Sequence, residues 1–157
     1  MKAGDTAPDF ELPDQNGTPR KLSALLVDGP VVLFFYPAAM TSGCTAEACH
    51  FRDMTAEFAR VGAQRVGISV DPVAKQKEFS EKHNFDYPLL SDQDGKIASD
   101  FGVKRGLLGK LAPVQRKTFV IGEGRQVLEV IKSEMKFSAH ADRALEALTA
   151  RGSRSAG

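Results

Sequence analysis

The sequence contains no tryptophan, only two cysteines and no long hydrophobic run. Its longest uninterrupted apolar run, Val31 to Tyr36, is far shorter than the roughly 20 residues that a membrane-spanning helix requires. Neither charge sign dominates, because 21 Lys and Arg residues face 20 Asp and Glu residues and leave a formal net charge of +1. The composition therefore gives no support to a nucleic-acid or membrane partner, whose recognition needs a clear excess of basic residues.

The length of 157 residues indicates a single domain, which we expect over residues 1–150, followed by a flexible polar tail over residues 151–157. A chain of this size buries about 70% of its unfolded surface on folding, so it needs no disulfide scaffold. The first ten residues, MKAGDTAPDF, lack the apolar segment of a secretory signal peptide. We therefore expect a cytoplasmic protein.

The hydrophobic pattern predicts strands that alternate with helices, then a β-hairpin and a last helix. Val31 to Tyr36 is rich in β-branched and aromatic residues, which is typical of a strand buried on both faces of a sheet. This order predicts an α/β, thioredoxin-like fold with a central mixed sheet flanked by helices. The other predicted elements are a short N-terminal hairpin (9–12 and 20–22), helices over 45–60, 71–83, 96–101 and 138–150, and strands over 66–70, 87–90, 117–121 and 126–131.

The two cysteines, Cys44 and Cys49, lie in the predicted helix that follows the Val31–Tyr36 strand. Cys44 falls at or near the first helical turn, where free backbone N–H groups and the helix dipole stabilise a thiolate. Its neighbours, Thr41 to Thr45, are small and polar, unlike the surroundings of an inert buried cysteine. Cys44 is therefore predicted to be a reactive thiol, with an inert core residue as the alternative.

Cys49 lies five residues after Cys44 on the same predicted helix. Five helical residues separate two Cα atoms by roughly 8–9 Å. A disulfide requires Cα atoms within about 7 Å. The two thiols therefore either never pair or pair only when the start of the helix unwinds, and Cys49 alone is equally consistent with a small core residue.

The segment around Cys44 resembles the active-site segment of peroxiredoxins. Pro37, Thr41 and Cys44 meet the family pattern of Pro, three residues, Thr, two residues and Cys. A second cysteine five residues later, Cys49, is the mark of the peroxiredoxin Q subfamily, also called bacterioferritin comigratory protein. The resemblance covers nearly the whole chain in order, and it continues in Ala7–Phe10, Tyr87–Asp92, Phe101–Val103 and Arg116–Ile121.

The resemblance implies a thiol peroxidase whose first step takes place at Cys44. Cys44 would be the peroxidatic residue, and Cys49 would be the resolving residue that forms a disulfide with it. Pro37 would shield the thiolate from water. The Thr41 hydroxyl would hydrogen-bond the thiolate and the bound peroxide.

The resemblance also implies a cation and backbone donors around the sulfur. Arg116 would stabilise the thiolate and polarise the O–O bond of the peroxide, and the backbone N–H groups of Gly43 and Cys44 can serve the same purpose. Glu47, one turn further along the helix, would orient Arg116 through a charge-assisted hydrogen bond, or else be a solvated carboxylate. Ser42 stands where the subfamily commonly has proline, which predicts a less rigid loop without removing a catalytic atom.

No cofactor or metal is expected. The three histidines, His50, His83 and His140, are scattered and have no spacing typical of metal ligands. The basic, glycine-rich stretch Lys104–Lys110 lacks the arrangement of a phosphate-binding loop, which leaves a solvated loop, a rim over the active site or a docking surface. The sequence also has no glycine-rich dinucleotide-binding motif after a predicted strand, so no nicotinamide or flavin cofactor is expected.

The expected substrates are hydrogen peroxide and organic hydroperoxides, and the expected reductant is thioredoxin or a similar dithiol protein. The resemblance favours a monomer, with a dimer as the alternative. Two other functions use the same thiol. One is a thiol–disulfide oxidoreductase, against which the spacing argues because that activity usually needs Cys-x-x-Cys. The other is a redox sensor or holdase-like binding protein that uses the thiol without turnover.

Overall fold

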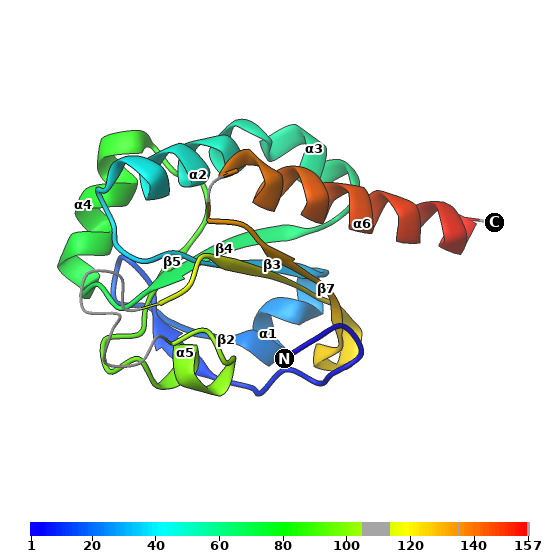
Figure 1. Ribbon diagram of the computed structural model, residues 1–157, viewed down its shortest axis with the longest axis horizontal. Helices are drawn as coiled ribbons and strands as arrows, with labels where there is room; N and C mark the ends of the chain where they lie inside the picture. The colour runs from blue at the N-terminus through cyan, green and yellow to red at the C-terminus, as the bar shows by residue number, and fades with distance from the viewer. Residues whose placement is uncertain (105–113, 135, 157) are drawn as a thin grey trace.

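The computed structural model describes residues 1–104, 114–134 and 136–156, and it has an α/β architecture built on a five-stranded sheet with a separate two-stranded hairpin (Figure 1). The helices and strands are β1 (Glu11–Pro13), β2 (Pro19–Lys21), α1 (Leu22–Leu25), the 3-10 turn η1 (Leu26–Asp28), β3 (Val31–Phe35), α2 (Ser42–Asp53), α3 (Thr55–Arg60), β4 (Gln64–Ser69), α4 (Val73–His83), β5 (Leu89–Ser91), α5 (Lys96–Asp100), β6 (Lys117–Ile121), the 3-10 turn η2 (Glu123–Arg125), β7 (Val127–Lys132) and α6 (Ser138–Ala156).

The main sheet is mixed, with the strand order β5-β4-β3-β6-β7. Strands β5, β4 and β3 run parallel, whereas β6 is antiparallel to β3 and β7 is antiparallel to β6. Strand β1 pairs with β2 in the N-terminal hairpin. The predicted thioredoxin-like fold, with a mixed sheet, flanking helices and an N-terminal hairpin, is confirmed.

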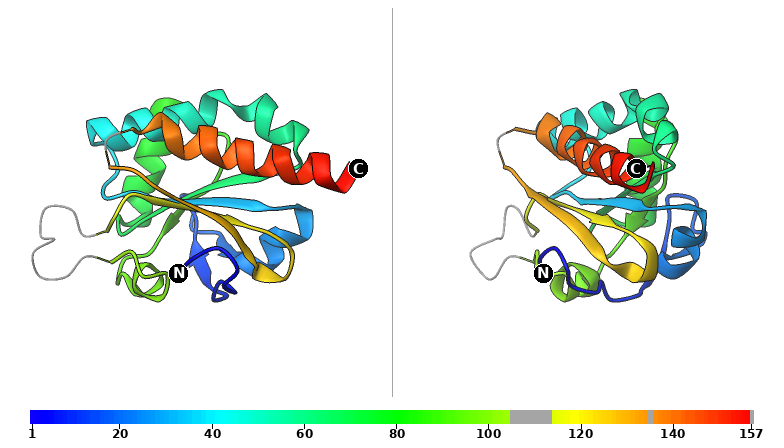
Figure 2. Two further views of the ribbon diagram at one scale, coloured as in Figure 1. Left: turned by 45° about the vertical axis from the view of Figure 1, so that its right-hand side comes forward. Right: turned by 90° about the vertical axis from the view of Figure 1, so that its right-hand side faces the viewer.

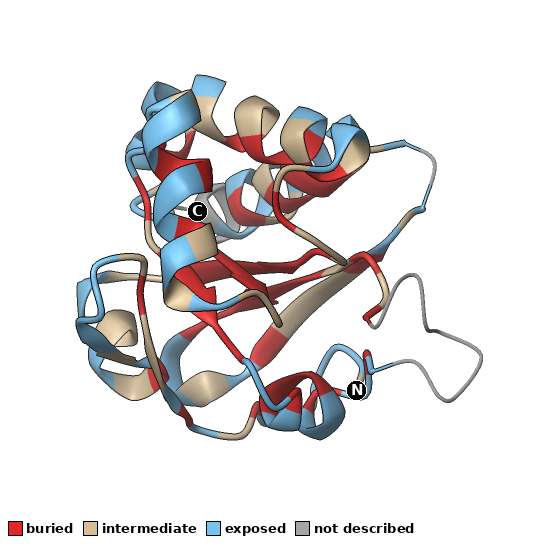
Figure 3. Ribbon diagram, turned by 90° about the vertical axis from the view of Figure 1, so that its left-hand side faces the viewer, coloured by how far each residue is buried: buried red, intermediate tan, exposed pale blue. Residues whose placement is uncertain are grey.

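Both faces of the sheet are covered, which explains why β3 is apolar at every position. Val31, Leu33 and Phe35 face a core shared with α1, α5 and the N-terminal segment, while Val32 and Phe34 face a second core shared with α2, α3, α4 and α6. Figures 1 and 2 show these two layers on opposite sides of the sheet. Buried residues accordingly line the strands and the inner faces of the helices in Figure 3.

The boundaries of two predicted helices differ from those in the structure. The predicted helix over 45–60 is two helices, because the chain breaks at Met54 with φ −105° and ψ 24°. Its first part also begins earlier, at Ser42. Asp71 does not cap the next helix, which begins at Val73 after Pro72. The carboxylate of Asp71 instead accepts hydrogen bonds from the Ala39 N–H at 2.7 Å and the Ser69 hydroxyl at 2.6 Å.

Two more differences concern the loops and the end of the chain. Short helical turns, α1 and η1, occupy the segment before β3, where no helix was predicted. Helix α6 continues through Ala156, past the predicted helix end at residue 150. The basic, glycine-rich stretch that begins at Lys104 lies outside the described residues from position 105 onward.

Candidate active site

Cys44 lies in the first turn of α2, just beyond the carboxyl end of the central strand β3. It is a free cysteine and only 1% exposed. The helix starts after Thr41, so the backbone N–H groups of Ser42, Gly43 and Cys44 have no acceptor within the helix. These groups and the positive end of the helix dipole lie at the turn that carries the sulfur.

Arg116 reaches the same point from the neighbouring strand. It directly precedes β6, which runs antiparallel to β3 with Phe35 opposite Lys117, so the start of β6 lies beside the end of β3. The guanidinium Nη2 of Arg116 donates to the Cys44 sulfur at 3.3 Å, and its Nη1 donates to Oε1 of Glu47 at 3.0 Å. The structure therefore brings one cation between a thiol and a carboxylate.

Glu47 lies three residues after Cys44 on the same face of α2 and is fully buried. Burial raises the pKa of Glu47 to about 8, although the Arg116 guanidinium opposes the shift. Burial also lowers the pKa of Arg116, but Glu47 and Cys44 outweigh it, so that the Arg116 pKa is raised overall. Arg116 thus stays charged, while the carboxyl of Glu47 titrates within the physiological range.

Gly43 allows the guanidinium to come this close. A Cβ at this position would lie 2.9 Å from Cζ of Phe137 and 3.2 Å from Nη2 of Arg116. The Phe137 ring in turn lies under the guanidinium, whose Cζ is 4.7 Å from the ring centroid. Sequence analysis singled out Gly43 only for its backbone N–H, and it missed Phe137, whose position depends on how α6 packs.

Thr41 and Pro37 lie in the loop between β3 and α2. Pro37 is half-buried, and Thr41 is exposed. The Thr41 hydroxyl donates to the Ala38 carbonyl at 2.8 Å rather than to the Cys44 sulfur. Its lone pairs remain able to accept a hydrogen bond from a bound ligand. Met40, the residue before Thr41, has a positive φ of 70°, so this loop holds a backbone conformation that non-glycine residues rarely adopt.

Cys49 lies further along α2, half-buried against the core on that side of the sheet. Burial raises the pKa of Cys49, while Arg52 acts in the opposite direction. Both cysteines are free, and one continuous helix of 12 residues contains them. Helix geometry separates their Cα atoms by roughly 8–9 Å, which is too far for a disulfide. This is the dithiol form, with Cys44 and Cys49 held apart.

Comparison with known proteins identifies the family. The model of the AhpC/TSA family matches residues 3–130. The crystal structure of peroxidoxin BcpB from Mycobacterium tuberculosis is 69% identical, covers 96% of this chain and 97% of its own, and superposes with a TM-score of 0.91. The chain is a peroxiredoxin of the AhpC/TSA family. Chloroplastic peroxiredoxin Q of Arabidopsis thaliana is 42% identical over 150 residues, which are 96% of this chain and 68% of the plant protein.

A third relative supports the subfamily. The bacterioferritin comigratory protein of Xanthomonas campestris, whose structures concern alkyl peroxide reduction, is 33% identical with a TM-score of 0.81 over 90% of this chain and 91% of its own. The resemblance to the peroxiredoxin Q subfamily is therefore confirmed. The individual roles of the site residues remain predictions, namely those of Cys44, Cys49, Thr41, Arg116, Pro37, Glu47 and Gly43.

A buried histidine of the peroxiredoxin was not singled out by the sequence. His140 of α6 is fully buried, and its Nε2 lies 3.5 Å from Oε2 of Glu47. Its Nδ1 is 2.8 Å from the hydroxyl oxygen of Thr118 on β6. Sequence reasoning placed His140 among three scattered histidines because no pattern in the chain shows that α6 packs beside α2.

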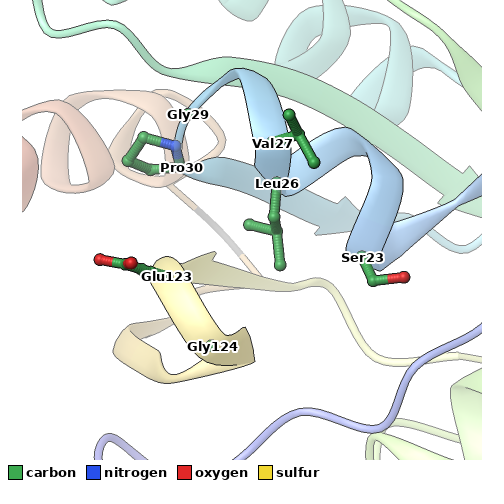
Figure 4. A pocket seen from close by; sticks show the side chains of 7 residues that line it. All are labelled: Ser23, Leu26, Val27, Gly29, Pro30, Glu123 and Gly124. Carbon is green, nitrogen blue, oxygen red and sulfur yellow. The ribbon is translucent and has the colours of Figure 1, made fainter.

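The peroxiredoxin also has a cavity far from Cys44. It has a volume of about 590 Å³ and lies between the α1–η1 segment and η2 (Figure 4). Gly29 and Pro30 line it just before β3 begins, whereas Cys44 follows the end of the same strand, so the cavity lies at the opposite end of the sheet. Within the described residues there is no group of three or more metal-ligating side chains and no helix long and apolar enough to cross a membrane.

Proposed function

We propose that this peroxidase reduces hydrogen peroxide and organic hydroperoxides through the Cys44 thiolate and an intramolecular disulfide with Cys49. Family membership makes the chain a thiol peroxidase. The observation that supports the assignment to Cys44 is the hydrogen bond of 3.3 Å from Arg116 Nη2 to its sulfur at the start of α2. The bacterioferritin comigratory protein of Xanthomonas campestris, whose structures concern alkyl peroxide reduction, supports the wider substrate range.

The first step forms a sulfenic acid on Cys44. The thiolate attacks one peroxide oxygen, so an S–O bond forms, the O–O bond breaks, and the electron pair leaves on the other oxygen as hydroxide or alkoxide. That oxygen then takes up a proton to give water or an alcohol. Arg116 and the N–H groups of Gly43 and Cys44 stabilise the charge as it moves onto the leaving oxygen. The Thr41 hydroxyl accepts a hydrogen bond from the peroxide.

The second step joins the two cysteines. The Cys49 thiol displaces the hydroxyl group of the Cys44 sulfenic acid, which forms the disulfide and releases water. Because the intact helix holds the two thiols too far apart, α2 must unwind at its start. Because Glu47 lies in the part of α2 that unwinds, its hydrogen bond with Arg116 then breaks. Pro37 limits access of water to the sulfur before that opening, and Ser42, the first residue of α2, leaves the start of the helix without the fixed φ that proline would impose.

The third step reduces the disulfide to the two thiols of Cys44 and Cys49. A dithiol protein such as thioredoxin exchanges with the Cys44–Cys49 disulfide, so that the partner is oxidised and the peroxidase is reduced. A cytoplasmic location suits this cycle, because the thiol pool there keeps cysteines reduced. We take the active form to be a monomer, since all residues of the site come from one chain. A sedimentation measurement distinguishes it from the alternative, a dimer.

Counting free thiols after one equivalent of hydrogen peroxide tests the route. Mass spectrometry with a thiol-blocking reagent should show the loss of both thiols in the wild type and a sulfenic acid on Cys44 in the Cys49→Ser variant. Cys44→Ser should abolish peroxide consumption. If Cys44→Ser still consumes peroxide, or if the wild type retains two free thiols, the assignment is wrong.

The role of Arg116 has a separate test. Arg116→Ala should slow oxidation of Cys44 by about 10²–10³-fold, by analogy with the loss of one oxyanion donor at about 3–4 kcal/mol. A rate constant within twofold of the wild type would refute this role. Turnover with a thioredoxin system distinguishes the peroxidase from a redox sensor, and reduction of insulin disulfides detects a general thiol–disulfide oxidoreductase.

A further inference from the structure

A line of buried polar groups continues behind Arg116, away from the sulfur. Glu47, His140 and Thr118 are each fully buried, and they come from α2, α6 and β6. Glu47 accepts from Arg116 through Oε1, but its other oxygen, Oε2, is buried without a hydrogen-bond partner at normal distance. Because a buried carboxylate oxygen without a donor is costly, the group that faces Oε2 affects how firmly Glu47 is held.

The hydrogen bonds of His140 determine which ring nitrogen carries the proton. Its Nε2 is 2.8 Å from the carbonyl oxygen of Ser133, which can only accept, so Nε2 must bear the hydrogen. Nδ1 of the neutral ring is then an acceptor, and the Thr118 hydroxyl donates to it at 2.8 Å. Nε2 itself also lies 3.5 Å from Oε2 of Glu47, which is an electrostatic contact and not a hydrogen bond, because the hydrogen is directed at Ser133.

We propose that His140 is a positioning residue for the peroxidase reaction, which holds Glu47 through the electrostatic contact between Nε2–H and Oε2 and thereby keeps Arg116 against the Cys44 sulfur. The imidazole does not touch the peroxide. It acts through two contacts: Nε2 of His140 lies 3.5 Å from Oε2 of Glu47, and Oε1 of Glu47 accepts the hydrogen bond from Nη1 of Arg116. Nη2 of the same planar guanidinium then points at the sulfur, because the fork of donors has a rigid geometry.

The surroundings of His140 keep the ring neutral. Burial lowers the pKa of His140, and the nearby Arg116 and Arg143 lower it further, while the Ser133 carbonyl and Glu134 act in the opposite direction. A neutral donor suits this position, since an imidazolium beside Glu47 would compete with Arg116 for the carboxylate. The neutral ring orients Glu47 and leaves Arg116 as the cation at the sulfur.

This inference rests on the proposed function, because it acts through the contact of Arg116 with the Cys44 sulfur. The same two helices also offer a matched control. His50 on α2 pairs with Asp142 on α6, with 2.8 Å between Nε2 and Oδ1, at an exposed position. His50→Asn therefore removes a histidine–carboxylate pair between α2 and α6 without touching Glu47.

The experiment measures two rate constants of Cys44 in the reduced full-length protein, with Cys49→Ser in every variant so that one thiol reports. One reaction is with hydrogen peroxide, and the other is alkylation by iodoacetamide, which does not need an O–O bond to be polarised. His140→Asn keeps a polar group near the Nδ1 position but loses the Nε2 donor. His140→Gln keeps an N–H donor near the Nε2 position and is the conservative rescue.

We expect His140→Asn to lower the peroxide rate constant by about 10- to 100-fold, the usual cost of losing an outer hydrogen-bond partner in a reactive site. The alkylation rate should change far less, and His140→Gln should recover most of the peroxide rate. His50→Asn should match the parent protein in both reactions. Thr118→Val, which removes only the hydroxyl that orients the ring, should lower the peroxide rate relative to alkylation, and it provides the test if His140→Asn does not fold.

Three outcomes would overturn the role of His140. In the first, His140→Asn reacts with peroxide as fast as the parent protein. In the second, the peroxide and alkylation rate constants fall equally in His140→Asn and in Thr118→Val. In the third, His140→Asn and His140→Gln behave alike. Failure of the proposed function is a different observation: the parent protein itself would then react with peroxide no faster than a free thiol.

Discussion

Gly43 shows how one residue without a side chain makes room for the catalytic cation. A Cβ at this position meets Phe137 at 2.9 Å and Arg116 at 3.2 Å, so Gly43→Ala must displace the ring or the guanidinium. Alanine is the better helix former, so the substitution does not weaken α2 itself. We expect the rate constant of Cys44 with peroxide to fall on the order of 10²-fold, as for a displacement of about 1 Å in a reacting group.

Stopped-flow measurement of Cys44 oxidation checks this expectation, with Ser42→Ala as the control. Ser42 is exposed and occupies the same helical turn, so its loss should leave the rate unchanged. A Gly43→Ala variant that reacts as fast as the wild type would show that Arg116 tolerates the extra carbon.

The buried carboxyl of Glu47 makes stability depend on pH. Its pKa is raised from 4.5 to about 8, so the folded state binds the proton more tightly than the unfolded chain. The resulting stability is complete below pH 4.5 and is lost as the pH rises through about 8. Between pH 6.5 and 8 we expect the free energy of unfolding to fall by roughly 1–2 kcal/mol through this group.

Urea unfolding of Cys44→Ser, with and without Glu47→Gln, measures this effect without interference from the reactive thiol. The fall with pH should be smaller in the double variant. His83 and His140, whose pKa values are lowered from 6.5, affect stability in the opposite direction up to and just above that value, so the pH profiles of the two proteins are compared with each other. Parallel pH profiles for the two proteins would show that Glu47 does not titrate in this range.

At the scale of elements, the structure marks how far α2 unwinds when the disulfide forms. Tyr87 donates its hydroxyl to the Ala48 carbonyl at 2.6 Å, and Arg65 donates to the Phe51 carbonyl at 2.8 Å. These two side chains donate from outside the helix to backbone carbonyls in the second half of α2. Among the described residues, no side chain donates in this way to a backbone carbonyl of α2 before Ala48. Unwinding should therefore stop near Ala48.

Hydrogen exchange on the dithiol and disulfide forms tests this boundary. If residues before Ala48 unwind, the amides of Ala46 to Phe51 lose their acceptors four residues earlier and should exchange quickly in the disulfide form. The amides of Arg52 and Asp53 should stay protected in both forms, and Tyr87→Phe should extend the loss of protection to Arg52. Equal protection of Ala46 to Phe51 in both forms, with the disulfide confirmed, would contradict local unwinding.

Some elements could be predicted from the sequence because one local signal determines them. Strand β3 is a run of apolar residues because both of its faces are covered, and β6 was predicted with its observed limits. The start of α2 could not be predicted in the same way, since Ser42 and Gly43 are poor helix formers and yet belong to the first helical turn. The break at Met54 could not be predicted either, because the apolar spacing of Phe51, Met54 and Phe58 continues across it.

At the scale of the whole molecule, the site depends on contacts that are remote in sequence. Cys44 and Glu47 could be paired by their spacing on one helix, but Arg116 lies 72 residues from Cys44 and was proposed from the family resemblance alone. The antiparallel pairing of β6 with β3 brings it to the sulfur. Phe137 and His140 depend in addition on how α6 packs against α2, so neither was predicted.

The whole fold should oppose the disulfide that catalysis creates. A short disulfide loop stabilises a folded chain by only about 2 kcal/mol through the entropy of the unfolded state. Against this, unwinding the start of α2 removes several backbone hydrogen bonds at about 1 kcal/mol each. It also breaks the buried hydrogen bond from the charged Arg116 to Glu47, and a hydrogen bond to a charged group contributes roughly 1.5–3 kcal/mol. The losses exceed the gain, so the disulfide form should be the less stable one.

Denaturant unfolding of the dithiol and disulfide forms measures this difference directly, and we expect the disulfide form to unfold at lower urea concentration by about 3 kcal/mol. Because stability and redox equilibrium are linked, the folded protein should then hold its disulfide at a potential about 60 mV more oxidising than the urea-unfolded chain does. A Cys44→Ser, Cys49→Ser variant should unfold identically under oxidising and reducing conditions. If the disulfide form proves as stable as the dithiol form, the fold does not favour reduction of the disulfide. Re-reduction must then depend on the partner protein alone.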